Sequence, residues 1–545
     1  ALRPLSWVRG WGPAPELISL ASWAAWRWAG PRAAFMRVAS PDAAVRRLPP
    51  PLRASLRDLF PPPKGPPIGA SGQGVVPAQL GSPFGASGPG VGQTEALVQE
   101  ALRAGKAILR LAPAADLLPV VVEAAALGPC LVVTPLVAQA SVLAERLRMV
   151  GVAVALMPGE WAQAAAGAPV VIGARGAAWA PCPGLASIVV LDGHEEGLAA
   201  EGAPTWNAWV VAAERAHRAR VPCIVVSACP TVEMLAWRRA RSRLVVPDRL
   251  AERAGWAALE VVDRRKEDRR SGLYSPRLVG LLRGGRRVVC VLNRKGRVRL
   301  LACSACGELT RCERCGGAVA LAEGTLSCAR CGTTRPLVCL ACGSTRSKAL
   351  RVGVSRAREE LEVLAGRPVG EVTSDTGELG DEGVLVGTEA VLRRVREADA
   401  VAFLDFDQEL LAPRYRASEE ALGLLAVASR LVGGRSRSGR VLVQTRLPQH
   451  EVVMAALMAD PARLASLEAP LRRDLSLPPE TAVALVSGSA ADGYVAALEG
   501  VEVLGPDRER WLVKASDHRC LADALSAQPH PGGRQLRIEV DPLRL

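Results

Sequence analysis

Residues 286–342 read RRVVCVLNRKGRVRLLACSACGELTRCERCGGAVALAEGTLSCARCGTTRPLVCLAC, an apolar run followed by eight cysteines. The cysteines form four Cys-x-x-Cys pairs, and two thiolates with this spacing can bind one tetrahedral ion from a tight turn. A second pair completes each ligand set and leaves no position for water, so the pattern predicts two structural zinc sites. The predicted ligands are Cys303, Cys306, Cys312, Cys315, Cys328, Cys331, Cys339 and Cys342.

Other uses of cysteine fit this pattern less well. A disulfide framework requires an oxidising compartment, and the sequence shows no signal peptide. A redox-active Cys-x-x-Cys would be expected once rather than four times in so short a stretch. An iron–sulfur cluster remains as the alternative, because four thiolates do not by themselves select the ion.

The four pairs can combine in two ways. A twelve-residue stretch separates the pair 312/315 from the pair 328/331 and can form a hairpin that brings the two together. The outer pairs 303/306 and 339/342 would then share the second ion in a nested module. In the sequential alternative, neighbouring pairs share an ion and are joined by connections of only five to seven residues.

Short apolar runs alternate with alanine-rich stretches on both sides of the cysteines. Runs without polar alternation are typical of strands buried on both faces, and helices between them indicate a parallel sheet. The sequence therefore predicts two α/β lobes in tandem, with the cysteine module interrupting the second lobe. The first set of runs includes 107–113, 130–136, 169–175, 187–193 and 222–229, and the second set is 286–293, 384–390, 400–406 and 440–446.

Composition favours a polyanionic partner. The 545 residues carry 68 Lys and Arg against 54 Asp and Glu, a net charge of +14. An arginine-rich proteome without such a partner is the alternative reading of this charge. The apolar stretch Leu111–Leu143 is interrupted by prolines and acidic residues, so we expect a buried sheet region rather than a membrane span, and a cytoplasmic, nucleoid-associated protein.

Five of the twelve tryptophans lie in the first fifty residues, at near-helical spacing. This predicts the core of a small helical domain rather than a base-stacking platform. A Pro-, Gly- and Ser-rich linker follows.

The region where a nucleotide would bind departs from a working phosphate loop. Such a loop reads G-x-x-x-x-G-K-[ST], and its lysine neutralises the terminal phosphates. Residues 87–94 read SGPGVGQT, with Gly92 and Thr94 in place but Gln93 where the lysine is required. After the run 187–191, Asp192 could hold a metal ion, but Gly193 follows where a water-positioning carboxylate is expected. Together these changes indicate a lobe without hydrolytic chemistry.

Several further motifs resemble one family. They are NRKG (293–296) before the octet, SACPT (227–231), VGTEAV (386–391), LDFDQEL (404–410), GGRSRSGR (433–440) and the terminal LRIEVDPLRL. Together with the octet, these motifs resemble the replication-restart primosomal helicase family, PriA, along almost the whole chain. The resemblance implies two nested structural zinc ions, a module used in DNA unwinding and in contacts with primosome proteins, and an arginine supplied to the nucleotide, for which Arg435 is the closest match.

The resemblance also sets the predicted fold. It implies two RecA-like helicase lobes with a double zinc module inserted in the second, plus a small N-terminal and a C-terminal α+β domain. The predicted domains are a helical, winged-helix-like domain at 1–60, a linker at 61–92, a degenerate lobe at 93–250, a second lobe at 275–300 and 345–440, the two-zinc module at 301–344 and the C-terminal domain at 441–545. The family's domain that grips the 3′ end of DNA would precede Ala1, and the whole pattern is similar to helicase-deficient PriA-like proteins of actinobacteria.

Basic residues beside the cysteines are the candidate DNA contacts. Arg294, Lys295 and Arg297 precede the octet, and Arg175 ends a run that matches a family motif touching the DNA backbone. Such groups would bind phosphate without reading sequence. A solvated basic face that offsets the charge of the zinc tetrathiolates is the alternative.

Two functions fit these features, because the lobes that flank the octet leave little room for a third, a zinc-ribbon nucleic-acid protein unrelated to replication. The first is a scaffold that binds stalled or branched forks and recruits primosome proteins, single-stranded DNA-binding protein and the loading machinery of the replicative helicase, with two zinc ions and without ATP hydrolysis. The second is an active ATP-dependent 3′→5′ DNA helicase with an unusual phosphate loop. Gln93 and Gly193 are the residues that discriminate between the two.

Overall fold

The first lobe is a seven-stranded parallel sheet with helices on both faces. The structure, a computed structural model, describes residues 10–52, 91–237, 242–267, 273–293, 301–314, 316–322, 324–328, 331–349, 354–372, 382–507, 509–530 and 535–544. The strand order is β3-β4-β2-β5-β6-β1-β7, and every neighbouring pair is parallel. The strands are β1 (Lys106–Arg110), β2 (Cys130–Val133), β3 (Val154–Leu156), β4 (Val170–Gly173), β5 (Ser187–Val190), β6 (Cys223–Ser227) and β7 (Arg243–Val245).

Alternation of side chains along the strands explains the two helical layers of this lobe. Ile108 faces a core shared with α1, α2, α7 and α8, and its neighbour Leu109 faces a core shared with α4, α5 and α6. The helices are α4 (Val91–Arg103), α5 (Leu118–Ala125), α6 (Val137–Met149), α7 (Trp161–Gly167), α8 (Ala208–Ala219) and α9 (Val232–Trp237).

The second lobe repeats this architecture with six parallel strands in the order β15-β16-β9-β17-β18-β8. Its strands are β8 (Ala258–Asp263), β9 (Val288–Val291), β15 (Val369–Val372), β16 (Val384–Gly387), β17 (Ala400–Phe403) and β18 (Arg440–Thr445). Its helices are α10 (Arg249–Gly255), α11 (Pro276–Arg283), α12 (Val354–Ala365), α13 (Ala390–Arg394), α14 (Asp407–Leu410), α15 (Ala417–Leu431), α16 (Glu451–Met458) and α17 (Pro461–Asp474).

Two predicted boundaries of the second lobe need correction. The lobe includes β8, which lies before the predicted start at 275, and β18, which crosses the predicted end at 440. The reason is pairing: β8 runs along the whole length of β18, from Ala258 opposite Arg440 to Asp263 opposite Thr445, so both belong to this sheet. The C-terminal sheet begins later than the predicted 441, at Ala482.

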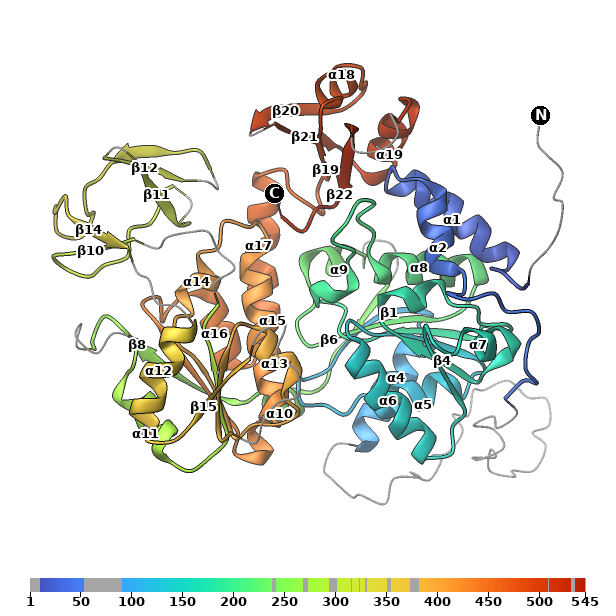
Figure 1. Cartoon of the computed structure of the whole chain (residues 1–545), viewed down its shortest axis with the longest axis horizontal. Helices are drawn as coiled ribbons and strands as arrows, with labels where there is room; N and C mark the ends of the chain where they lie inside the picture. Colours follow the sequence, from blue (N-terminus) through green and yellow to red (C-terminus); the bar gives the residue numbers. More distant parts are fainter. Residues whose placement is uncertain are drawn as a thin grey trace, which may run out of the picture.

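The cysteine module lies between β9 and α12 in the chain and apart from both sheets in space (Figure 1). It consists of β10 (Leu301–Cys303) paired with β14 (Ser347–Ala349), and of a three-stranded sheet of β11 (Val319–Ala322), β12 (Thr325–Cys328) and β13 (Thr334–Pro336). Leu309 and Ala318 join the core of the second lobe, so the module has an apolar contact with that lobe.

Helix α1 (Pro15–Arg27) packs against α19 (His518–Ala527) of the C-terminal domain beside the first lobe (Figure 1). Helices α1 (Pro15–Arg27) and α2 (Arg32–Ala39) share one core with the first lobe and with the C-terminal domain. Trp28, Phe35, Trp179 and Trp206 lie in a row, with neighbouring ring centroids 5.6–6.3 Å apart, and all four are buried. Of the N-terminal tryptophans that the structure describes, Trp28 is buried as predicted, Trp23 and Trp26 are half-buried, and Trp11 is exposed. The described residues from 10 to 52 form two helices and one isolated bridge, Trp11 with Val45; the predicted linker falls almost entirely outside the described residues.

The C-terminal domain is an antiparallel sheet in the order β20-β21-β19-β22, covered by two helices. Asp541 accepts from Arg27 at 2.7 Å and from His518 at 2.8 Å, which ties this domain to α1. The elements are β19 (Ala482–Ser487), α18 (Ala491–Ala496), β20 (Glu502–Asp507), β21 (Arg510–Ala515), α19 (His518–Ala527) and β22 (Arg537–Val540). Among the described residues, no helix is both long enough and apolar enough to cross a membrane.

Candidate metal centres and interlobe cleft

The cysteine pairs sit in four backbone turns of one kind. In each turn, the amide of the glycine after the pair donates to the carbonyl of the pair's first cysteine at 2.8–2.9 Å. These glycines have φ between +69° and +78°, a region that favours glycine because a Cβ clashes there. The sequence C-x-x-C-G thus specifies each turn locally. The four bonds are Gly307 to Cys303, Gly316 to Cys312, Gly332 to Cys328 and Gly343 to Cys339.

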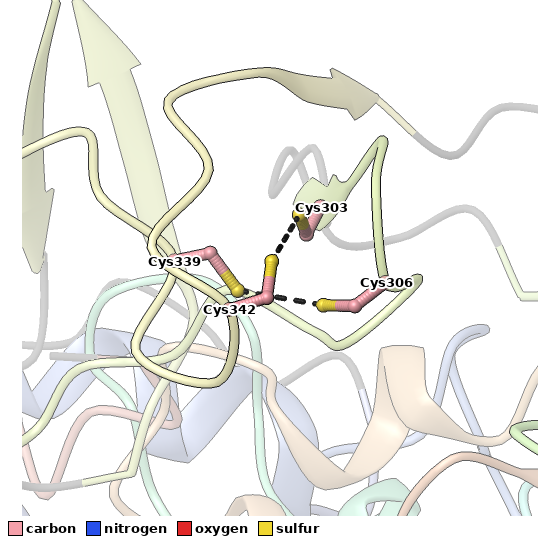
Figure 2. A group of neighbouring side chains, drawn as sticks. All are labelled: Cys303, Cys306, Cys339 and Cys342. Atoms are coloured by element: carbon pink, nitrogen blue, oxygen red, sulfur yellow. Dashed lines mark hydrogen bonds between the residues drawn. The ribbon is translucent and has the colours of Figure 1, made fainter.

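The outer pairs form one complete four-sulfur cluster (Figure 2). The Sγ atoms of Cys303 and Cys342 are 3.6 Å apart, those of Cys306 and Cys339 are 3.5 Å apart, and all four lie within 4.8 Å of one another. A tetrahedral zinc with Zn–S bonds near 2.3 Å requires sulfurs about 3.8 Å apart, so the donor set fits the ion. Antiparallel pairing of β10 with β14 brings the two turns together across the chain.

The inner pairs form a second cluster at the base of the hairpin of β11 and β12. Cys312, Cys328 and Cys331 come within ligand distance of one another, with the Sγ atoms of Cys312 and Cys331 3.5 Å apart. Cys315, the fourth predicted ligand, lies outside the described residues. The two outer cysteine pairs therefore share one cluster and the two inner pairs share the other, which is the nested arrangement and not the sequential one.

Backbone amides favour the thiolate form of Cys303, whereas burial and the neighbouring thiols raise the pKa of Cys306 to about 12. Donation from the amides of Cys306 and Ala305 lowers the pKa of the Cys303 thiol to about 6. A thiolate is the form that binds zinc. The two clusters could therefore each hold a metal ion, and the all-sulfur donor set is the one that zinc accepts in structural sites.

Gln93, which stands where the phosphate-loop lysine is expected, makes a structural contact. Gln93 lies in the first turn of α4, and its side-chain amide donates to Asp248. Asp248 caps α10 by accepting from the Ala251 amide at 2.8 Å. Gln93 thus ties the first helix of one lobe to the helix that leads into the next.

Asp192 is buried in the cleft between the lobes, with 2 % of its surface exposed. Arg430, from the last turn of α15, donates to both of its carboxylate oxygens at 2.6 Å, and Gln139 of α6 donates at 2.7 Å. Burial by itself would raise the pKa of Asp192, but the Arg430 guanidinium outweighs it and lowers the pKa to about 2. The carboxylate is charged, and its counter-ion is an arginine of the second lobe.

The three residues after Asp192 are closely packed or engaged with other side chains. A Cβ on Gly193 would lie 2.5 Å from Cγ1 of Val225 and 2.9 Å from Cε of Met234. His194 contacts Ser227 through Nδ1 at 2.9 Å, and burial lowers its pKa. Glu195 pairs with Arg393 of the second lobe at 2.6 Å.

The other predicted contacts are dispersed. Arg175 begins the 3-10 helix η1 (Arg175–Trp179), where it is exposed, whereas Arg294, Lys295 and Arg297 lie outside the described residues. Arg435 lies near Arg249 and Arg253; burial and these two charges lower its pKa. Sequence reasoning missed Arg430, although an arginine in the last turn of a helix as apolar as α15 was an available signal.

Comparison with known proteins gives a consistent result. No family model matches the chain. The probable replication restart protein PriA of Mycobacterium leprae is 30% identical over 502 residues, which cover 82% of this chain and 74% of that protein. The replication restart proteins PriA of Thermotoga maritima and Bacillus subtilis are each 28% identical, over 65% and 61% of this chain and 52% and 45% of theirs.

The chain spans about half the length of these last two relatives. Among solved structures, RecG bound to a three-way DNA junction aligns over 69% of this chain and 46% of that one, at 12% identity and a TM-score of 0.39. The identity to the mycobacterial protein extends over most of both chains. The chain belongs to the PriA family of replication restart proteins.

Proposed function

We propose that this chain acts in replication restart as a scaffold that binds stalled or branched DNA forks and promotes primosome assembly without hydrolysing ATP. Membership of a family whose relatives are named replication restart proteins supports the process. The partners proposed are forked DNA, primosome proteins, single-stranded DNA-binding protein and the machinery that reloads the replicative helicase, in the cytoplasm.

The packing around Gly193 is the observation that supports loss of hydrolysis most directly. A carboxylate next to the metal-binding aspartate would have to project from this position, and Val225 and Met234 fill the space. Gln93 removes the positive charge that a triphosphate requires, and its amide is engaged with Asp248. Both changes lie in the first lobe, at positions that would act on the same reaction.

We propose that each cysteine cluster holds one structural zinc ion. Zinc binding to such sites contributes on the order of 10 kcal/mol of apparent free energy. The module has a small core of its own, formed by Leu301, Val319 and Leu326 with two cysteines, so the metal would supply much of its stability. The ions would orient the four turns and leave no site for a reacting water.

DNA binding would rest on phosphate contacts. The net charge of +14 supports it, and the proposed contacts are Arg175 on the first lobe and Arg294, Lys295 and Arg297 before the module. Such contacts favour recognition of a fork by its shape.

The test is DNA-stimulated ATP hydrolysis by the zinc-loaded full-length chain on a forked substrate, with fork binding recorded in the same samples at low and high salt. We expect salt-sensitive binding without turnover above background, in wild type and in Gln93→Lys alike, because the lysine would restore only one of the missing groups. Turnover that Asp192→Asn abolishes would instead establish the alternative, an active helicase.

A further inference from the structure

Arg430 crosses the cleft between the lobes. It leaves α15 of the second lobe, donates to both oxygens of Asp192 and, through Nε, to the carbonyl of Pro113 at 2.8 Å. Asp192 and Pro113 both follow strands of the first lobe, β5 and β1. One arginine therefore binds two loops of the opposite lobe.

A second ion pair lies close to the first along the chain and again joins the lobes. Arg393 of α13 donates to Glu195 at 2.6 Å, and the Glu195 side chain is only 8% exposed. Glu195 is three residues from Asp192. The loop after β5, which would serve a nucleotide in a hydrolysing lobe, is thus held at two carboxylates by two arginines of the second lobe.

A third contact is a buried cluster of charges at α9. Glu233 of the first lobe accepts from Arg416 at 2.7 Å and from Arg472 at 3.3 Å. Arg472, 1% exposed on α17, also donates to Glu419 at 2.5 Å. Glu419 in turn accepts from the Val232 amide of α9 at 2.7 Å, which closes the cluster across the interface.

From these contacts we infer that the two lobes are fastened in one closed arrangement by the chain's own ion pairs, with Arg430 occupying the Asp192 carboxylate that a nucleotide-bound metal ion would need. We name Asp192–Arg430, Glu195–Arg393 and the Glu233, Glu419, Arg416 and Arg472 cluster the interlobe latch. A magnesium ion would have to displace a guanidinium from both Asp192 oxygens. The inference rests on the proposed function in one respect, since a hydrolysing motor must open and close this cleft.

The physical reason for expecting a rigid closure is burial. An ion pair on the surface exchanges readily with water, whereas separating a buried pair exposes or strands a charge. The latch joins the loop after β5 and helix α9 of the first lobe to α13, α15 and α17 of the second, so a hinge motion would have to break more than one contact at once. The lobes should therefore keep their distance whether or not a nucleotide is present.

The test is single-molecule energy transfer in the zinc-loaded full-length chain, with dyes on unnatural amino acids at positions 149 and 363. Met149 on the first lobe is 85% exposed and Val363 on the second is 81% exposed. We expect one narrow population in wild type, unchanged by magnesium with a non-hydrolysable ATP analogue. Arg430→Ala with Arg393→Ala should broaden it toward longer distances, and Arg146→Ala, which breaks an exposed pair within the first lobe, should not.

A second variant distinguishes loss of the latch from misfolding caused by an unpaired buried charge. Asp192→Asn with Arg430→Gln removes both charges without leaving either buried alone, and it should also broaden the distribution. Wild-type populations that shift with the nucleotide analogue, or latch variants that stay as narrow as wild type, would overturn the inference. Fork binding without hydrolysis together with mobile lobes would overturn the latch alone, whereas ATP turnover would overturn the proposed function.

Discussion

At the scale of single residues, Gly193, which stands where a carboxylate is expected, is closely packed. Gly193 is set against Cγ1 of Val225, a branched side chain on a buried strand that has little freedom to move. The space that a side chain at position 193 would need is filled, so adding a side chain there would overpack the core.

Replacing Gly193 by alanine should therefore destabilise the protein by about 1–3 kcal/mol, because the added methyl group overpacks a filled site. Gly280→Ala is the matched control. Gly280 is exposed within α11, a methyl group there meets nothing within 4 Å, and alanine in a helix should stabilise by up to about 1 kcal/mol. Thermal or denaturant unfolding of both variants measures this, and equal shifts for the two would contradict the packing argument.

At the scale of elements, each cysteine turn forms locally, and the two proposed zinc sites depend on how the turns meet. Cys339 belongs to the outer cluster alone. Cys339→Ser should thus lower bound zinc from two ions per chain to about one, and the inner hairpin should keep its ion.

Zinc content by elemental analysis, with Cys520→Ser as the control, checks this expectation. Cys520 is exposed and belongs to neither cluster, so its variant should keep both ions. Two zinc ions retained after loss of Cys339 would refute the four-sulfur assignment, and loss of both would mean that the two centres fold as one unit.

At the scale of the whole molecule, the closed lobes bring like charges together beside the latch. Glu196 of the first lobe and Glu420 of the second line a small cavity, in which Glu420 pairs with Arg414 at 2.6 Å. Burial and the neighbouring Glu196 raise the pKa of Glu420 to about 8. The folded protein therefore keeps a proton there that the unfolded chain releases near pH 4.5.

The raised pKa of Glu420 fixes the direction in which pH changes the free energy of unfolding. Between about pH 4.5 and 8 the native state binds more protons than the unfolded state, so this group's contribution to stability falls as pH rises. Glu420→Gln should leave stability nearly unchanged at pH 4 and raise it by about 1–3 kcal/mol at pH 8.5. Denaturant unfolding at both pH values measures this, with exposed Glu499→Gln as the control; a variant with no gain at high pH would contradict the proposed protonation.

The sequence by itself determined the local features of this protein. Apolar runs of four or five residues predicted the parallel strands, since a strand buried on both faces has no polar position, and each C-x-x-C-G specifies its own turn through one glycine. The sequence also showed that Gln93 and Gly193 stand where a lysine and a carboxylate are expected. The lobe boundaries were not, because β8 and β18 belong to one sheet only by pairing.

Only the tertiary structure decided what depends on residues far apart in the chain. The spacing favoured a shared site for the outer cysteine pairs, and the pairing of β10 with β14 is what brings Cys303 and Cys342, 39 positions apart, into one cluster. Asp192 and Arg430 are 238 positions apart, so no local pattern could connect them. Local backbone preference acts over a few residues, whereas the Asp192–Arg430 pair exists only once the two lobes have folded and closed on each other.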